Sequence, residues 1–433
     1  MAMVIQISSQ SLNNLGYQIL AGMGGESMFV IAATLSGLGV AVMCPIGAKL
    51  GDIFGRSYIA LIGGIFTFVL HTILAFIKDP LAWVICRTLI PFALGMFLSI
   101  PFTIPAEVYP ETYSQKSGIV NAALALGIVV GSYGGGLLYD AGAEKFAVIL
   151  AGIFALVGAV MIAASVPNRK QEGIKLDVMG VIWLFVFLTS LCLVLTFASS
   201  WGFGAATIIG VAVIIVSAVL LVVTEKKAES PCLPFKFFKN KTYLFLALFG
   251  LFASMYQYVI QVYTPMFGQE VLAKTTAQTG SWQVPRTIVC IIAPIVFAMV
   301  VKKTNSAFKK CLVVAGITTL ICFAMLLLPG AGHSAGLICV ALAVTGIGEG
   351  LRGISMNPLT ITTLQPQEIG IGIGLMSAMG SIGAQVSAAI VGLVFNANVT
   401  RGLEAGVFST YWTMIVMGVL SIFFILLVDT KKS

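Results

Sequence analysis

The sequence predicts an all-α polytopic membrane protein, and both its composition and its apolar runs support this prediction. Hydrophobic residues make up 59% of the 433 residues and charged residues only 9%, which leaves too little polar surface to cover a soluble core of this size. Apolar runs of about 18 or more residues can cross about 30 Å of hydrocarbon as helices. Besides a more polar candidate at residues 1–20, we find thirteen such runs: 27–48, 57–77, 81–104, 117–139, 145–166, 178–198, 205–223, 242–264, 283–301, 309–329, 335–361, 369–395 and 406–428.

The basic residues lie mostly on one side of these spans. Placing the 45–58 loop in the cytoplasm puts seventeen of the 24 Lys and Arg residues inside and four outside, with Arg87, Arg286 and Arg352 within spans. This is the positive-inside distribution of membrane proteins. The net charge of +8 therefore orients the protein and does not indicate a nucleic-acid partner. We expect a protein of the cell membrane with a cytoplasmic C-terminus.

Other classes of protein find little support in the sequence. The eight cysteines show no CxxC or Cys/His pairing, so they predict neither a metal site nor a disulfide framework. Neither a soluble domain nor a nucleophile–base pair is visible, which argues against an enzyme. We expect no cofactor and a monomeric protein.

An internal repeat divides the chain. A shift of 256 residues places Pro110, Gly118, Gly127 and Gly136 on Pro366, Gly374, Gly383 and Gly392. Each span then maps onto the span eight further on without a change of orientation, as parallel repeats do. Since six-helix halves would give an offset of six, two spans are inserted between them. We expect an N-terminal bundle at 1–166, an inserted helix pair at 167–241 and a C-terminal bundle at 242–433.

The same shift makes a prediction about the first helix. It aligns residues 1–20 with the second half of the span that starts at 242 and with the loop after it. We therefore expect the chain to begin inside its first transmembrane helix, although a short, polar first helix is an alternative. Gln6, Gln10 and Asn13 are too polar to face lipid and should face a cavity or other helices.

Four segments carry a family resemblance, and in one of them Arg87 with Gly95 resembles the helix 4 motif of the major facilitator superfamily, with Pro91 where a glycine is common. "GAKLGDIFGRS" resembles the loop motif between helices 2 and 3 of the major facilitator superfamily, with Ile53 and Ser57 in place of basic residues. "LGIVVGSYGGGLLYD" resembles the helix 5 motif of proton-coupled exporters, with Ser132 in place of a proline. Residues 175–243 are similar to the inserted helix pair and following loop of the fourteen-helix drug:proton antiporter branch.

The resemblance implies a fold and an activity. The fold is the major facilitator fold, with two six-helix bundles plus two inserted helices. The activity is proton-coupled efflux of amphipathic drugs or related small molecules by alternating access. Because Ser132 departs from the exporter motif, an uptake symporter or facilitator for a small metabolite stays open as the alternative.

The helix 2–3 loop is a candidate conformational latch. Its members are Gly47, Asp52, Gly55 and Arg56, with Glu107 as a further charged partner. Charges four residues apart can hold neighbouring helix ends together in one state and release them in the other. The alternative is a solvated turn with ordinary interfacial charges.

A glycine row in the helix 5 motif predicts close packing of helices. Gly127, Gly131 and Gly135 lie four residues apart on one face, with Gly134 beside them. Small residues at this spacing let helix backbones approach closely. Packing alone accounts for the row, so it does not indicate the direction of transport.

Ionisable residues within spans are candidates for proton coupling. Glu349 lies near the middle of its span, and Arg352 follows at i+3 on the same face. Charged groups there are costly and therefore often functional, although a neutralised structural pair is equally compatible. His71 could carry a proton, but a lone histidine more often makes a structural hydrogen bond.

Other polar and aromatic residues are candidates for a substrate cavity. Tyr256, Gln257 and Gln261 follow one another along one span, and aromatic rings can hold apolar and cationic ligands. The further candidates, all polar or cationic and within spans, are Gln6, Gln10, Asn13, Arg87, Asn121, Arg286 and Asn357. The expected partners are a small-molecule substrate, protons and the lipid bilayer, with the proton gradient as the energy source.

Overall fold

A computed structural model of the chain describes ten segments, and helices dominate them. The described residues are 2–98, 100–101, 104–105, 113–168, 177–201, 204–228, 235–300, 304–328, 334–365 and 369–429, and none of these residues lies in a strand. The long helices are α1 Ala2–Gly22, α2 Phe29–Phe54, α3 Arg56–Leu74, α4 Pro80–Phe97, α6 Tyr113–Val129, α8 Glu144–Ser165, α9 Val178–Trp201, α10 Ala205–Lys227, α11 Lys241–Ser254, α15 Gln283–Val300, α16 Asn305–Leu326, α17 Ala335–Ile361, α18 Ile369–Asn398 and α19 Leu403–Leu426. The shorter elements are η1 Glu26–Met28, η3 Val130–Gly134, α7 Gly135–Asp140, η4 Phe235–Lys239, α12 Tyr256–Tyr258, η5 Val259–Tyr263, α13 Thr264–Glu270, α14 Thr276–Ser281 and η7 Val399–Arg401.

The thirteen predicted apolar runs each coincide with a helix, which confirms the all-α fold. Within the described residues, eleven helices are long and apolar enough to cross a membrane. Helices suit such runs because every backbone polar group is satisfied inside the segment. Local signals mark the helix boundaries. Asp79 caps the start of α4 by accepting a 2.7 Å hydrogen bond from the Ala82 amide, and Pro80 is the first residue of that helix. Gly55, at φ +96°, separates α2 from α3.

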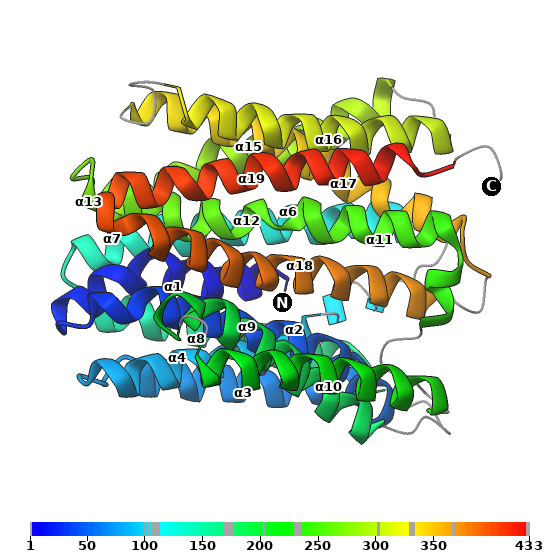
Figure 1. Cartoon of the computed structure of the whole chain (residues 1–433), viewed down its shortest axis with the longest axis horizontal. Coiled ribbons are helices and arrows are strands. Elements are labelled where there is room, and N and C mark those ends of the chain that lie inside the picture. The colour runs from blue at the N-terminus through cyan, green and yellow to red at the C-terminus, as the bar shows by residue number, and fades with distance from the viewer. Residues whose placement is uncertain are drawn as a thin grey trace.

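The helices form two bundles with an inserted pair at their side. In Figure 1 the N-terminal helices, in blue, occupy the lower part of the molecule, and the C-terminal helices, yellow to red, the upper part. Helix α9 packs against α2 of the first bundle and α18 of the second, and α10 packs on α9. The inserted pair therefore covers the seam between α2 and α18.

The glycine contacts of the two halves confirm the repeat and correct its register at the first helix. A Cβ on Gly127 would meet the backbone of Met3 in α1, and a Cβ on Gly383 would meet the backbone of Leu251 in α11. Met3 and Leu251 are 248 residues apart, so residues 1–20 correspond to 249–268 and not to 257–276. The reason is that the connection from α13 to α15 contains α14 and is longer than that from α1 to α2. Helix α1 has 21 residues, against 30 for Lys241–Glu270.

The two ends of the bundles differ in the elements that lie there. The α14 end is where α1, α7 and α13 end and where α14 lies, at the left in Figure 1. The Gly55 end is where α2 ends, beside Asn168, whose amide donates a 3.0 Å hydrogen bond to the Phe54 carbonyl.

Candidate functional site

A cavity of about 560 Å³ lies between the two bundles. Helices α1 and α6 of the first bundle and α11, α12, α15, α17 and α18 of the second contribute its walls. It extends toward the Gly55 end, since Ile119 near the start of α6 and Asn357 near the end of α17 both line it. This volume is in the range of small-molecule sites.

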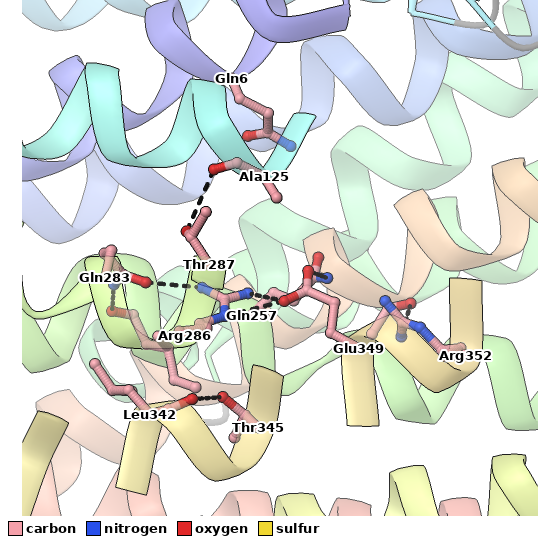
Figure 2. Close-up of polar contacts among 12 residues, drawn as sticks. Gln6, Ala125, Gln257, Gln283, Arg286, Thr287, Leu342, Thr345, Glu349 and Arg352 are labelled. Atoms are coloured by element: carbon pink, nitrogen blue, oxygen red, sulfur yellow. Dashed lines mark hydrogen bonds and ion pairs between the residues drawn. The ribbon is translucent and has the colours of Figure 1, made fainter. Parts of the chain in front are cut away.

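An ion pair between two helices stands at the cavity wall. Arg286 of α15 and Glu349 of α17 approach to 2.9 Å between Nη2 and Oε2, with the arginine side chain 1% and the glutamate 19% exposed. Gln257 donates to Oε1 of Glu349 at 3.3 Å, and Gln283 accepts from Nη1 of Arg286 at 2.9 Å. Figure 2 shows Arg286 between Gln283 and Glu349. Both carboxylate oxygens are therefore engaged by side chains of the second bundle.

Arg352 does not pair with Glu349, so the predicted i,i+3 pair is wrong. Its Nη1 donates to the Ala253 carbonyl at 2.6 Å and to the Ser254 hydroxyl at 3.2 Å. Carbonyls in the last turn of a helix lack partners within the helix and attract arginine, and α11 ends at Ser254. Arg286 meanwhile reaches the carboxylate from the neighbouring helix. In Figure 2 the two arginines lie on opposite sides of Glu349.

The structure divides the predicted cavity residues into two groups. Those that line the cavity are Gln6, Asn121, Gln257 and Asn357. Those that do not line it, contrary to the prediction, are Gln10, Asn13, Tyr256, Gln261, Arg87 and Arg286. Tyr256 and Gln10 are buried in the protein, and Arg286 lies behind Glu349. The aromatic wall expected along this span is therefore not part of the cavity.

Arg87 holds α4 against α1. Its side chain is 1% exposed, and Nη2 donates to Oδ1 of Asn13 at 3.1 Å. The guanidinium lies 5.3 Å from the ring centroid of Trp83 and 5.9 Å from that of Phe29. Cation–π contacts of this kind stabilise a desolvated cation. These contacts occupy both Arg87 and Asn13 inside the first bundle.

The surroundings of His71 fit the structural alternative. The ring is fully buried, with Nδ1 2.8 Å from the Thr67 carbonyl and Nε2 3.0 Å from the Ser8 hydroxyl. Because a carbonyl only accepts hydrogen bonds, Nδ1 carries the proton and Nε2 accepts from Ser8. Both nitrogens are used, and His71 does not line the cavity.

The predicted latch residues meet at the Gly55 end. Asp52 and Arg56 form a 2.9 Å ion pair across the turn between α2 and α3. Gly47 packs on the backbone of Met96. At Gly55 a side chain would collide with Asn168 as well as oppose the positive φ. Glu107 lies outside the described residues.

The glycine row of α6 to α7 packs on α1 at three of its four positions. A Cβ on Gly127, Gly131 or Gly135 would meet Met3, Ile7 or Ser11, respectively, which are the successive turns of α1. Gly134 is different, since nothing lies within 4 Å of its Cβ position. Including Gly134 among the packing glycines was wrong because it points away from the face that the other three share.

The sequence did not reveal a cluster of hydrogen bonds that joins the bundles at the α14 end. At its centre, Asn14 donates to the carbonyls of Ser132 and Thr276, both at 2.9 Å. Its Oδ1 accepts from Gln269 and from the hydroxyl of Thr279, both at 3.2 Å. Asn14 is 2% exposed, so these bonds are shielded from water. We call these five residues the α14 clasp.

Helix α14 is positioned against the first bundle by Asp140. This carboxylate accepts a 3.0 Å hydrogen bond from the Ala277 amide and a second one from the Thr276 hydroxyl. Gly136 lets the two backbones touch, since a Cβ there would lie 2.7 Å from the Ala277 nitrogen. The signal that could have revealed α14 is the capping box of Thr275 and Gln278.

The family model described as Major Facilitator Superfamily matches residues 2–388. The multidrug transporter protein MdtP of Bacillus subtilis is 25% identical over 389 residues, which cover 88% of this chain and 71% of MdtP. The quinolone resistance protein NorB of Staphylococcus aureus is 26% identical over 417 residues, covering 93% of this chain and 87% of NorB.

Solved structures agree with the fold. The D-xylose–proton symporter has a TM-score of 0.68 at 13% identity, covering 100% of this chain and 96% of that one. The human organic anion transporter MFSD10 has a TM-score of 0.63 at 14% identity, covering 98% and 97%.

The two bundles, their parallel repeat and the cavity between them define a multi-pass membrane transporter and not an enzyme. The chain belongs to the Major Facilitator Superfamily.

Proposed function

We propose that this protein exports amphipathic drugs or related small molecules in exchange for protons. The names of its relatives, a multidrug transporter and a quinolone resistance protein, support this substrate class. The observation that carries the proposal is the carboxylate of Glu349, which lies at the cavity wall and is bound to Arg286 of a neighbouring helix. The Glu349 carboxylate is accessible from the cavity, and its interaction with Arg286 depends on whether it is charged.

A proton on Glu349 would change the contacts between α15 and α17. Neutralising the carboxylate removes most of its attraction for Arg286 and leaves a buried cation to find other partners. The positions of the two helices then depend on whether a proton is bound. Exchange follows if the cavity releases its substrate in the state that takes up the proton.

Alternating access would open the two ends in turn. With the α14 clasp closed, the cavity extends toward the Gly55 end. Rocking of one bundle against the other opens the opposite side in transporters of this architecture. The Asp52–Arg56 latch would then act on this equilibrium without touching the substrate.

The remaining assignments belong to the same proposal. The distribution of Lys and Arg supports an orientation in the plasma membrane with the Gly55 end and the C-terminus in the cytoplasm. The bundles are taken as residues 1–166 and 242–433, with the inserted pair at 167–241. The protein works as a monomer, with the proton gradient as its energy source and without a cofactor.

The test is transport by Glu349→Gln in proteoliposomes. In the wild type, a pH gradient should drive a fluorescent quinolone against its own concentration gradient. In the variant, the rate of this proton-driven transport should fall at least about 100-fold, while exchange of substrate across the membrane is retained. Glu26→Gln, which removes an exposed carboxylate outside the cavity, is the matched control. Proton-driven transport by a well-folded Glu349→Gln protein would contradict the proposal, and movement of drug together with protons would establish a symporter instead.

A further inference from the structure

The charges that line the cavity do not balance. Its walls include one carboxylate, Glu349, and one guanidinium, Arg352. Glu349 is already neutralised by Arg286. Arg352 bonds only neutral partners, the Ala253 carbonyl and the Ser254 hydroxyl, and makes no ion pair within the described part of the chain. Among the described residues, the cavity therefore has one positive charge without a counterion.

We propose that Arg352 binds an anionic group of the substrate, so that the cavity selects amphipathic acids and zwitterions over purely cationic drugs. This inference rests on the proposed transport function and specifies its substrate class. A cation between transmembrane helices is costly unless it is paired. A carboxylate supplied by the substrate removes that cost at the moment of binding.

The geometry of the guanidinium fits this role. Nη1 is fully used by α11, which fixes the plane of the group. Nε and Nη2, which form the adjacent edge, have no hydrogen-bond partner among the described residues. Neither atom is fully buried, so this edge is accessible to a ligand. This edge presents two parallel N–H groups, the arrangement that binds a carboxylate through two hydrogen bonds.

The rest of the cavity accommodates the apolar body of such a molecule. Met356 and Met376 line it together with Ile291, and methionine side chains adapt to ligands of different shapes. Glu349 and Arg352 are one helical turn apart, with Cβ atoms about 5–6 Å from each other. A zwitterion can therefore place its amine near Glu349, where the amine competes with a proton, while its carboxylate binds Arg352.

A quinolone acid and its ester separate this inference from general hydrophobic binding. Norfloxacin carries a carboxylate and an amine, and its ethyl ester retains only the amine. The wild type in lipid nanodiscs should bind the acid about tenfold more tightly than the ester at pH 7. Arg352→Gln should weaken binding of the acid about tenfold and leave the ester within about twofold. Arg401→Gln, which removes an exposed arginine at the α14 end, should retain the preference.

Two results would overturn the inference. One is equal binding of acid and ester by the wild type, and the other is an equal loss of both ligands in Arg352→Gln. If that variant does not fold, Arg352→Lys replaces it: the lysine keeps the charge but not the fork, so its preference must fall below that of the wild type. Proton-driven transport of the ester without a preference for the acid refutes this inference alone. Absence of proton-driven transport of either compound refutes the proposed function, while the binding preference still tests Arg352.

Discussion

The two ends of the molecule are held by different interactions. At the α14 end, hydrogen bonds between Asn14 and the second bundle and between Asp140 and α14 join one bundle to the other. At the Gly55 end, the ion pair of Asp52 and Arg56 joins two helices of the same bundle. The first arrangement closes the path between the bundles, whereas the second shapes one bundle and leaves the cavity to extend in its direction. Closure at one end thus depends on the contacts of Asn14 and Asp140 with the second bundle.

The strength of the clasp suits a reversible closure. Each neutral hydrogen bond contributes about 1 kcal/mol net, so the three bonds that the Asn14 side chain makes to the second bundle contribute about 3 kcal/mol. A difference of this size shifts a two-state equilibrium about 160-fold. It is large enough to keep one end closed and small enough for substrate and proton binding to reverse.

The largest effect is expected from Asn14→Asp. The carboxylate keeps the shape of the side chain but cannot donate to the Ser132 and Thr276 carbonyls, so the clasp should open. Spin labels at Gly22 and Lys274 of a cysteine-free protein, both at the exposed α14 end, should report a longer distance, and transport should fall more than about 100-fold. Gln18→Ala is the control, since it removes an exposed hydrogen bond to Glu270 between the same bundles and should change transport less than about twofold. An unchanged distance in Asn14→Asp would contradict the role of the clasp.

A second, smaller effect is expected from Gly136→Val. The added side chain meets the backbone of Thr276 and Ala277 in α14, and overpacking of this kind costs about 3 kcal/mol. The same spin-label distance should lengthen, and transport should fall roughly 30-fold to 100-fold. Gly134→Val, two residues earlier with nothing within 4 Å of its Cβ position, should behave as the wild type. Equal effects of the two valines would mean that the helix itself, and not its contact with α14, was disturbed.

The smallest effect is expected from Asp52→Asn at the opposite end. This change breaks an ion pair that is partly exposed, at 24% for Asp52 and 16% for Arg56, so its energy is modest. Transport should slow about tenfold, while the equilibrium affinity for substrate stays within about threefold because neither residue lines the cavity. Arg56→Gln should slow transport to a similar degree. A loss of affinity as large as the loss of transport would argue against a latch.

The long helices could be predicted because their signal is local. An apolar run of sufficient length has few alternatives to a membrane helix, and Gly55 and Asp79 mark helix ends by their own chemistry. Helix α14 could not be predicted in this way because its sequence, TAQTGS, is short and polar. Because α14 lengthens the connection after α13, the repeat register predicted for the first helix was wrong.

The candidate site was less predictable because its contacts depend on how the helices pack. Glu349 was found from its depth in a span, but its partner was not: Arg352 is adjacent in sequence, whereas Arg286 is 63 residues away and meets it only through the packing of α15 on α17. In the same way, polarity alone could not separate Gln6, which lines the cavity, from Asn13, which bonds Arg87.

The position of α9 has a consequence for the route by which molecules reach the cavity. This helix covers the seam between α2 and α18, so that side is walled off from the acyl chains. On the α6–α15 side, Ile119 and Ile295 line the cavity and are 64% and 52% exposed. The two flanks of the cavity therefore differ: α9 covers one, whereas the other presents exposed apolar side chains. We expect apolar molecules dissolved in the bilayer to reach the cavity on the α6–α15 flank.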